Sequence, residues 1–128
     1  MDMKLELVPV PVADIDRAKA FYVDQVGFHA DHDIPVDESL RFVQLTPPGS
    51  ACSIVLDLNM TPMAPGSLQG LQVVVDDSQA VHDELAAKGV AVEPVQDMPW
   101  GRFTFFTDPD GNRWSVQQLP EWSAATGS

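Results

Sequence analysis

The chain repeats one pattern of secondary structure, and this repeat limits the folds open to it more than any other feature. In each copy a valine-rich segment runs into an aspartate suited to capping a helix, Asp14 in the first copy and Asp77 in the second, 63 residues apart. The glycines that follow the two helical segments, Gly27 and Gly89, are 62 residues apart. Aspartate favours the helix N-cap, and glycine favours the position after the last turn. The matched order of strand, cap, helix and glycine predicts two copies of one supersecondary unit.

Hydrophobic periodicity predicts the same order of elements, βαββ, in both copies. The resulting fold class is α+β, in a single domain over 1–128, with a first unit at 4–58, a linker at 59–69, a second unit at 70–119 and a tail at 120–128. Within the units we expect helices from Asp14 to Gly27 and from Ser78 to Lys88, and strands at Lys4–Val12, Arg41–Leu45, Ser53–Leu58, Val90–Val95, Arg102–Thr107 and Arg113–Leu119. The acidic stretch Ala30–Ser39 has no apolar alternation, so we expect a solvated loop there, with a short extended piece as the alternative.

Two prolines fall within the first strand, and their chemistry constrains its place in the sheet. Pro9 and Pro11 have no N–H to give to a ladder. The first strand should therefore have a free or irregular side.

The charge balance excludes whole classes of partner. The 128 residues include 7 Lys and Arg against 19 Asp and Glu, a formal net charge of −12. Nucleic acid and anionic membrane surfaces both require basic patches, so neither is an expected partner. The long-range field favours a cationic ligand.

The cysteine count and the apolar runs bear on compartment. The single cysteine, Cys52, excludes an intramolecular disulfide. The sequence shows no signal-peptide pattern and no apolar run long enough to span a membrane, so a cytoplasmic location is expected.

Three motifs, together with the paired units, carry a resemblance to a known family. They are Asp-x-Asp-Arg-Ala-x-x-Phe-Tyr over 14–22, Val-Gly-Phe at 26–28 and Asp-Pro-Asp-Gly-Asn at 108–112. The pattern resembles the vicinal-oxygen-chelate superfamily of glyoxalases, bleomycin resistance proteins and extradiol dioxygenases, and it covers residues 4–119. The resemblance implies a cup-shaped mixed sheet from each unit and a homodimer with ligand sites in the cups.

The metalloenzymes of that superfamily place metal ligands on the first and last strand of each unit. Carried over to this sequence, those positions are Leu7, Val55, Gly70 and Ser115. A divalent ion requires several imidazole or carboxylate ligands, and these residues supply at most one hydroxyl. We therefore expect no metal and no cofactor. His29 and His32, together with Asp57, are the only fallback ligands for a metal site built elsewhere.

Side chains that share a face with those four positions form the expected ligand site. Strand alternation extends the set to one mostly apolar lining with a few polar groups, namely Leu7, Ser53, Val55, Asp57, Gly70, Gln72, Arg113, Ser115 and Gln117. Gly70 in place of a bulky residue leaves room for a larger ligand. Trp100, just before a strand, either stacks on a planar ligand at the mouth or plugs the space under its loop, and the plug is slightly favoured.

Two functions remain open from the sequence. The first is a metal-independent protein that binds a small organic molecule, such as a drug-sequestering resistance protein with a cationic or aromatic ligand. The second is an enzyme, either a metal-free isomerase, cyclase or lyase with Asp57 as acid or base, or a glyoxalase-like lyase or dioxygenase with a non-standard metal site.

Overall fold

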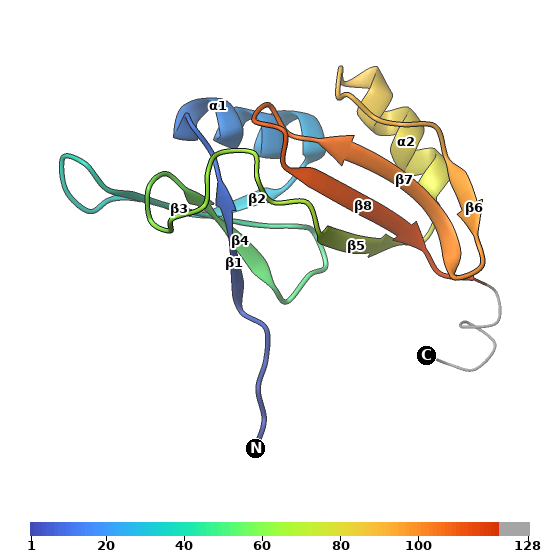
Figure 1. Cartoon of the computed structure of the whole chain (residues 1–128), viewed down its shortest axis with the longest axis horizontal. Helices are drawn as coiled ribbons and strands as arrows, with labels where there is room; N and C mark the ends of the chain where they lie inside the picture. The colour runs from blue at the N-terminus through green and yellow to red at the C-terminus, as the bar shows by residue number, and fades with distance from the viewer. Residues whose placement is uncertain (121–128) are drawn as a thin grey trace. The chain divides into compact units, whose positions relative to one another are not determined.

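The computed structural model describes residues 1–120, and its contacts divide the chain into two compact units. Of the described residues, unit 1 comprises 1–68 together with the turn at 108–112, and unit 2 comprises 69–107 and 113–120. Each unit contains one four-stranded mixed sheet and its own helical segment (Figure 1). The α+β class and the two repeated modules are therefore confirmed, and each module contains one strand more than βαββ, in the order βαβββ. None of the helices within residues 1–120 is long and apolar enough to cross a bilayer.

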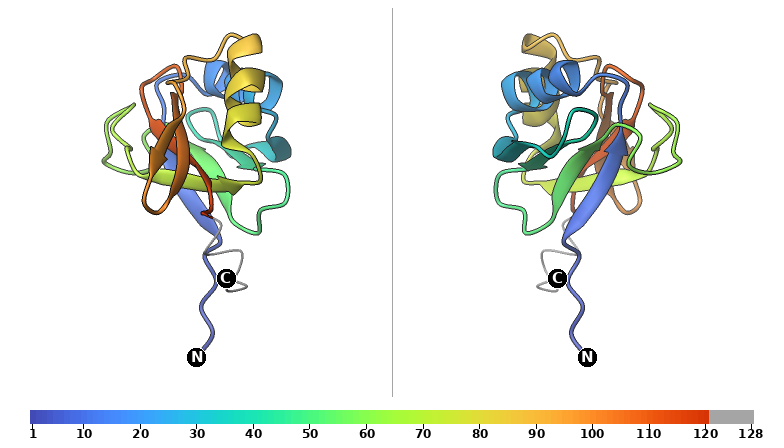
Figure 2. Two further views of the ribbon diagram at one scale, coloured as in Figure 1. Left: turned by 90° about the vertical axis from the view of Figure 1, so that its right-hand side faces the viewer. Right: turned by 90° about the vertical axis from the view of Figure 1, so that its left-hand side faces the viewer.

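Unit 1 is built around a sheet in the order β1-β4-β3-β2. β1 runs parallel to β4, and β4–β3 and β3–β2 are antiparallel. Figure 2 shows β1 and β4 side by side. The elements are β1 (Leu7–Pro11), α1 (Ile15–Ala20), the π-helix η1 (Phe21–Val26), β2 (His29–Pro35), β3 (Arg41–Thr46) and β4 (Ser53–Asp57).

The two prolines of β1 face the unpaired edge of this sheet. The Ser53 N–H donates to the Glu6 carbonyl and the Val12 N–H donates to the Asp57 carbonyl, both at 2.9 Å, so even-numbered residues bond to β4. The odd-numbered residues, including Pro9 and Pro11, turn their backbone groups outward. Since proline nitrogen carries no hydrogen, that edge presents few donors to another strand. The predicted free side of the strand is confirmed.

The first helix begins as predicted and ends differently. The Asp14 side chain caps α1 by accepting from the Arg17 N–H at 3.1 Å, and Gly27 ends the helical segment at φ 95°. Between them the chain widens into η1 from Phe21 on, so the expected α-helix is α only over its first part. Phe21 and Tyr22 are both buried, and they complete the apolar stripe begun by Ala18.

Of the two alternatives for Ala30–Ser39, the extended piece is confirmed and the solvated loop is wrong over the first part, because His29–Pro35 forms β2. β2 pairs with β3 throughout, with a bulge between Ala30 and His32. Polar contacts compensate for the missing apolar pattern: Asp33 accepts from the Arg41 guanidinium at 2.8 Å and from the Lys19 ammonium at 2.6 Å. Backbone pairing and these ion pairs stabilise an exposed strand that buries little apolar surface.

Unit 2 repeats the arrangement with the sheet order β5-β8-β7-β6. β5 and β8 are parallel, while β7 pairs antiparallel with both β8 and β6. The elements are β5 (Leu71–Val75), α2 (Ser78–Ala87), β6 (Gln96–Met98), β7 (Gly101–Thr107) and β8 (Arg113–Gln118). The strand expected at Val90–Val95 is wrong: Val92 makes one isolated bridge to Phe106, and the second strand of the unit is β6.

The Asp-Pro-Asp-Gly-Asn turn at 108–112 is a structural element of unit 1. One Asp108 carboxyl oxygen accepts from the backbone N–H groups of residues 110, 111 and 112 at 2.9–3.0 Å. The other accepts from the Tyr22 hydroxyl at 2.7 Å. The Asn112 amide donates to the Pro11 carbonyl at 2.8 Å, so this turn is fixed to both β1 and η1 by buried hydrogen bonds.

Candidate functional site

The candidate site residues divide between two sheet faces, one in each unit. In sheet 1, Arg41 and Asp33 reach Asp16 and Lys19 of α1, so the strand residues that alternate with them point to the opposite side. We call this the far face of sheet 1. Strand register places on it the side chains of Leu7, Pro9, Pro11, Phe42, Gln44, Thr46, Ser53, Val55 and Asp57, together with His29, His32 and Ile34 of β2.

Polar side chains on the far face of sheet 1 form a connected chain. The Gln44 amide donates to the Ser53 hydroxyl at 3.2 Å, and the Ser53 and Thr46 hydroxyl oxygens lie 2.6 Å apart. The Thr46 hydroxyl donates to the Asp31 carboxylate. Only Ser53 of these four was an expected site residue. Gln44 and Thr46 alternate along β3, a signal that could have found them, whereas Asp31 joins them through the bulge in β2.

Asp57, the expected acid or base, has both carboxylate oxygens in use. One accepts from the Met60 and Thr61 N–H groups at 2.7 and 3.1 Å, and the other accepts from the Thr61 hydroxyl. The residue is 2% exposed. These contacts fix the first turn of the segment that follows β4.

The far face of sheet 2 collects the expected residues of the second unit. Gln118 of β8 accepts from the Ser78 N–H at the start of α2, so its side chain lies on the helix side of the sheet. Ser115 and Gln117 alternate with it along the strand and point to the other side. Register sets Gln72 beside Ser115 and Val74 beside Gln117. The Gln72 amide donates to the Gln117 side-chain carbonyl at 2.7 Å.

Two phenylalanines, absent from the expected set, complete the far face of sheet 2. Phe103 and Phe105 lie opposite Gln117 and Ser115, with their rings stacked at a centroid distance of 5.9 Å. The Arg113 guanidinium carbon lies 4.4 Å from the Phe105 ring centroid, and its nitrogen pairs with Glu93 at 3.0 Å. Period-two alternation across the predicted hairpin could have identified both rings. The face therefore combines a half-buried ring, Phe105, stacked on the buried Phe103, a cation that is paired with Glu93, and paired amides.

Trp100 lies in the turn between β6 and β7. Its ring is not a plug, because the residue is 57% exposed. The Gln117 amide donates to the Trp100 carbonyl at 2.8 Å, which ties the turn to the far face of sheet 2. Gly101 tightens the turn further: its φ is 151°, and a Cβ there would lie 2.6 Å from the Gln118 carbonyl oxygen. The indole is thus held at the surface by an ordered backbone.

The four positions that hold metal in related enzymes do not fit a metal here. Leu7 pairs with Ser53 in register and Val55 pairs with Pro9, which surrounds the first pair of positions with carbon and one hydroxyl. Gly70 precedes β5, and a Cβ at that residue would meet nothing within 4 Å. Ser115 is the one oxygen donor among the four.

The fallback histidines also lack a completed ligand set. His29 and His32 are exposed on β2, opposite Thr46 and Gln44. Residues 1–120 contain no group of three or more His, Cys, Asp or Glu side chains placed to hold a metal ion.

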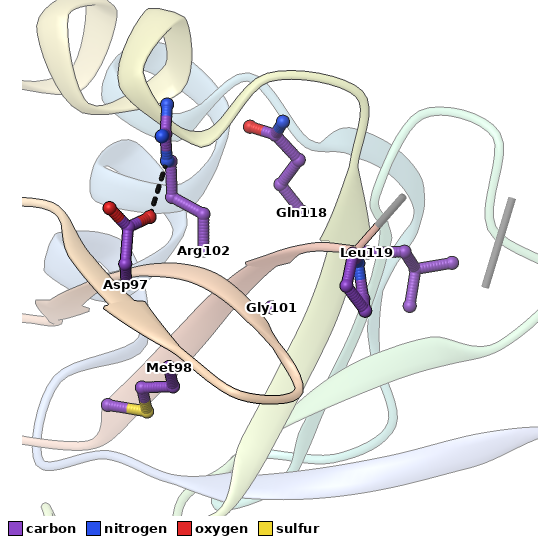
Figure 3. A pocket seen from close by; sticks show the side chains of 7 residues that line it. Asp97, Met98, Gly101, Arg102, Gln118 and Leu119 are labelled. Carbon is purple, nitrogen blue, oxygen red and sulfur yellow. Dashed lines mark hydrogen bonds and ion pairs between the residues drawn. The ribbon is translucent and has the colours of Figure 1, made fainter. Parts of the chain in front are cut away.

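A pocket of about 240 Å³ opens at the end of sheet 2. It is lined by Asp97, Met98, Gly101, Arg102, Gln118, Leu119 and Pro120. Figure 3 shows the Asp97–Arg102 ion pair, 2.8 Å long, on one side and Leu119 on the other. None of these residues is among the predicted site residues, because they come from three segments whose register the sequence does not determine.

The carboxyl groups with lowered pKa values lie away from both far faces. Arg41 and then Lys19 hold the pKa of Asp33 well below its usual range, and Asp33 lies on the helix side of sheet 1. Hydrogen bonds from Ser39 lower the pKa of Asp37 in the loop after β2. His82 and Gln79 lower the pKa of Asp83 on the surface of α2. These shifts arise from ion pairs and turn geometry.

The sequence matches one known protein family over most of its length. Residues 4–116 match the sequence profile of the glyoxalase/bleomycin resistance protein/dioxygenase superfamily. The chain belongs to this superfamily. The match covers both units and the 108–112 turn, so the expected family is confirmed.

Solved structures of the superfamily include antibiotic-binding relatives. TnmS3, an antibiotic binding protein from Streptomyces sp. CB03234, is 40% identical, with a TM-score of 0.87 over 93% of this chain and 98% of that one. A glyoxalase/bleomycin resistance protein from the same strain is 42% identical, with a TM-score of 0.81 over 90% and 100%. YetH of Bacillus subtilis, an uncharacterized protein, is 31% identical over 88% of this chain and 95% of its own.

Proposed function

We propose that this protein binds a small organic molecule without a metal ion and sequesters it, as a drug-binding resistance protein does. The observation that carries the proposal is the far face of sheet 2. There the stacked Phe103 and Phe105 rings, the Arg113 guanidinium and the Gln72–Gln117 amide pair lie together. Aromatic surface with a few placed polar groups is the usual composition of an organic ligand site.

Two further observations support binding over metal chemistry. The family's ligand positions hold Leu7, Val55, Gly70 and Ser115, which together supply one oxygen donor. The TnmS3 protein, 40% identical to this chain, is an antibiotic binding protein. A homodimer, as the family resemblance implies, and a cytoplasmic location are part of the proposal.

The proposed ligand is planar and cationic. Trp100 is 57% exposed on an ordered turn beside the far face of sheet 2, where an indole can stack on a planar ring. The net charge of −12 raises the local concentration of cations. A flat aromatic ring bearing an amine satisfies both features.

Calorimetric titration with two planar probes of opposite charge tests this function. We expect 9-aminoacridine, a cation, to bind more tightly than 9-anthracenecarboxylate. Trp100→Ala should weaken 9-aminoacridine binding by about 1–3 kcal/mol, because stacking on one aromatic side chain contributes about that much. The matched control is Val36→Ala, which removes a similarly exposed apolar side chain from unit 1. The proposal fails if neither probe binds, or if the two variants have the same affinity.

A further inference from the structure

The hydrogen bonds on the far face of sheet 1 run in one direction. The Thr46 hydroxyl donates its single hydrogen to Asp31. The Thr46 oxygen must then accept from the Ser53 hydroxyl, 2.6 Å away, because Thr46 has no second hydrogen to give. The Ser53 oxygen in turn accepts from the Gln44 amide at 3.2 Å. The order Gln44, Ser53, Thr46, Asp31 is therefore fixed by donor count.

Burial makes this series of hydrogen-bonded side chains a rigid support for Asp31. Ser53 is 6% exposed, and Thr46 and Gln44 are partly buried between neighbouring strands. Hydroxyl groups in such a setting stay bonded, since an unpaired buried donor is costly. Asp31 lies at the outer end, with about a quarter of its side chain exposed. Its carboxylate is held in place from the protein side and is accessible from the solvent side.

The bulge in β2 is what brings Asp31 to this position. His29 is opposite Thr46 and Ala30 is opposite Leu45, and the register then shifts so that His32 is opposite Gln44. Asp31 is the extra residue, and bulges commonly redirect a side chain in this way. The local strand geometry therefore aims a carboxylate along the far face.

At the two ends of this series of hydrogen-bonded side chains, Asp31 and Gln44, the groups that can still bind a ligand are mainly acceptors. The second Asp31 oxygen lies 3.8 Å from His29 Nε2, which is longer than a hydrogen bond. Gln44 has donated one amide hydrogen to Ser53, and its side-chain carbonyl faces the same side of the sheet. A carboxylate and a carbonyl on one face fit a group that carries several N–H donors and a positive charge.

We propose that the far face of sheet 1 is a subsite for an organic ammonium group. Asp31 binds the cation, the Gln44 carbonyl accepts a further N–H, and Thr46 and Ser53 are positioning residues that orient Asp31. This inference rests on the proposed ligand-binding function and names the group that sheet 1 recognises. It adds Asp31, Gln44 and Thr46 to the residues expected to contact or position a ligand.

Nuclear magnetic resonance titration of the full chain tests the subsite separately from planar binding. The probes are benzylammonium and benzyl alcohol, which have similar shape and differ in charge. We expect benzylammonium to shift the Gln44 side-chain amide and the backbone signals of Asp31 and Thr46, and benzyl alcohol to leave them in place. No shift with benzylammonium overturns the subsite, whether or not 9-aminoacridine binds. The separate titration with planar probes decides the ligand-binding function itself.

Substitutions of Asp31 and Thr46 distinguish a role in positioning the ligand contact from a purely structural role. Asp31→Asn should weaken benzylammonium binding about tenfold, since a charge-assisted contact is lost. Asp24→Asn, which removes the same charge from an exposed position on η1, is the matched control. Thr46→Val should weaken binding several-fold, and Thr46→Ser, which restores the hydroxyl, should recover it.

Coupling between the two residues gives the sharpest outcome. In the Asp31→Asn background, Thr46→Val should cause no further loss of benzylammonium affinity, because Thr46 acts through Asp31. Additive losses, or equal losses in Asp31→Asn and Asp24→Asn, would overturn the assignment.

Discussion

Single carboxyl groups in this chain take different roles according to what their oxygens contact. Both Asp57 oxygens accept from the backbone and hydroxyl of the segment that follows them. Both Asp33 oxygens face cations. One Asp31 oxygen accepts from Thr46, and the other has a histidine nitrogen no nearer than 3.8 Å. The contacts of the carboxylate oxygens thus identify Asp57 as a turn cap, Asp33 as an ion-pair partner and Asp31 as a candidate ligand contact.

Asp57→Asn should lower the stability of the fold. The asparagine side chain keeps one acceptor oxygen, but in place of the second oxygen it has an NH2 group. Asp57 accepts hydrogen bonds with both oxygens and is 2% exposed, so the NH2 group faces a donor in a buried site. We expect a loss of about 1–3 kcal/mol in the free energy of unfolding by urea. The control Asp24→Asn should change it by less than about 0.5 kcal/mol. Equal stability in the two variants would free Asp57 for the acid or base role that the sequence suggested.

Strand alternation in the sequence predicted only part of the two far faces. Ser53, Gln72, Ser115 and Gln117 follow from period-two spacing on clear strands, and the register places each beside the neighbours expected of one face. Asp31 could not be predicted, since its direction depends on a bulge in a strand without apolar alternation.

At the scale of elements, the strands that pattern recognition found are the ones that bury apolar side chains. β4 is buried along its whole length and β7 along most of it, and both were predicted. The sequence of β2 leaves a loop and an extended piece both open, because its residues are mostly exposed and its stability depends on pairing with β3 and on ion pairs. The widening of the first helix into η1 likewise has no local signal that we can identify.

The unpaired edge of β1 is protected by composition, and this has a measurable consequence. Pro9→Val introduces an outward N–H on an edge strand and so restores a donor that another chain can pair with. We expect the variant to associate beyond the state of the parent chain, with light scattering that rises with concentration. Pro48→Val, the same change in the turn between β3 and β4, should scatter like the parent. Identical scattering from all three proteins would show that β1 needs no such protection.

At the scale of the whole molecule, the distribution of the few cations matters more than their number. Of the seven Lys and Arg residues, at least five form ion pairs with carboxylates: Arg17, Lys19, Arg41, Arg102 and Arg113. These ion pairs involve five carboxylates, Asp16, Asp33, Glu93, Asp97 and Asp110. The formal net charge of −12 still favours a cationic ligand. Two of these ion pairs, Lys19–Asp33 and Arg41–Asp16, link the helix side of sheet 1 to α1.

This link predicts how stability depends on pH. The Arg41 and Lys19 contacts lower the pKa of Asp33 below its ordinary value of 3.8 in the folded chain. Unfolded chains therefore bind the proton more readily, and the stabilisation is complete above that ordinary value and is lost as the pH falls below it.

Asp33→Asn removes this contribution, and comparison with the parent at each pH cancels the effect of the overall charge. The two proteins should differ most in unfolding free energy at neutral pH, and the difference should shrink at about pH 3 and below. Urea unfolding across this range measures it, with Asp24→Asn as the control for loss of one negative charge. A difference that stays constant to low pH would mean that Asp33 stabilises the unit by packing rather than by its charge.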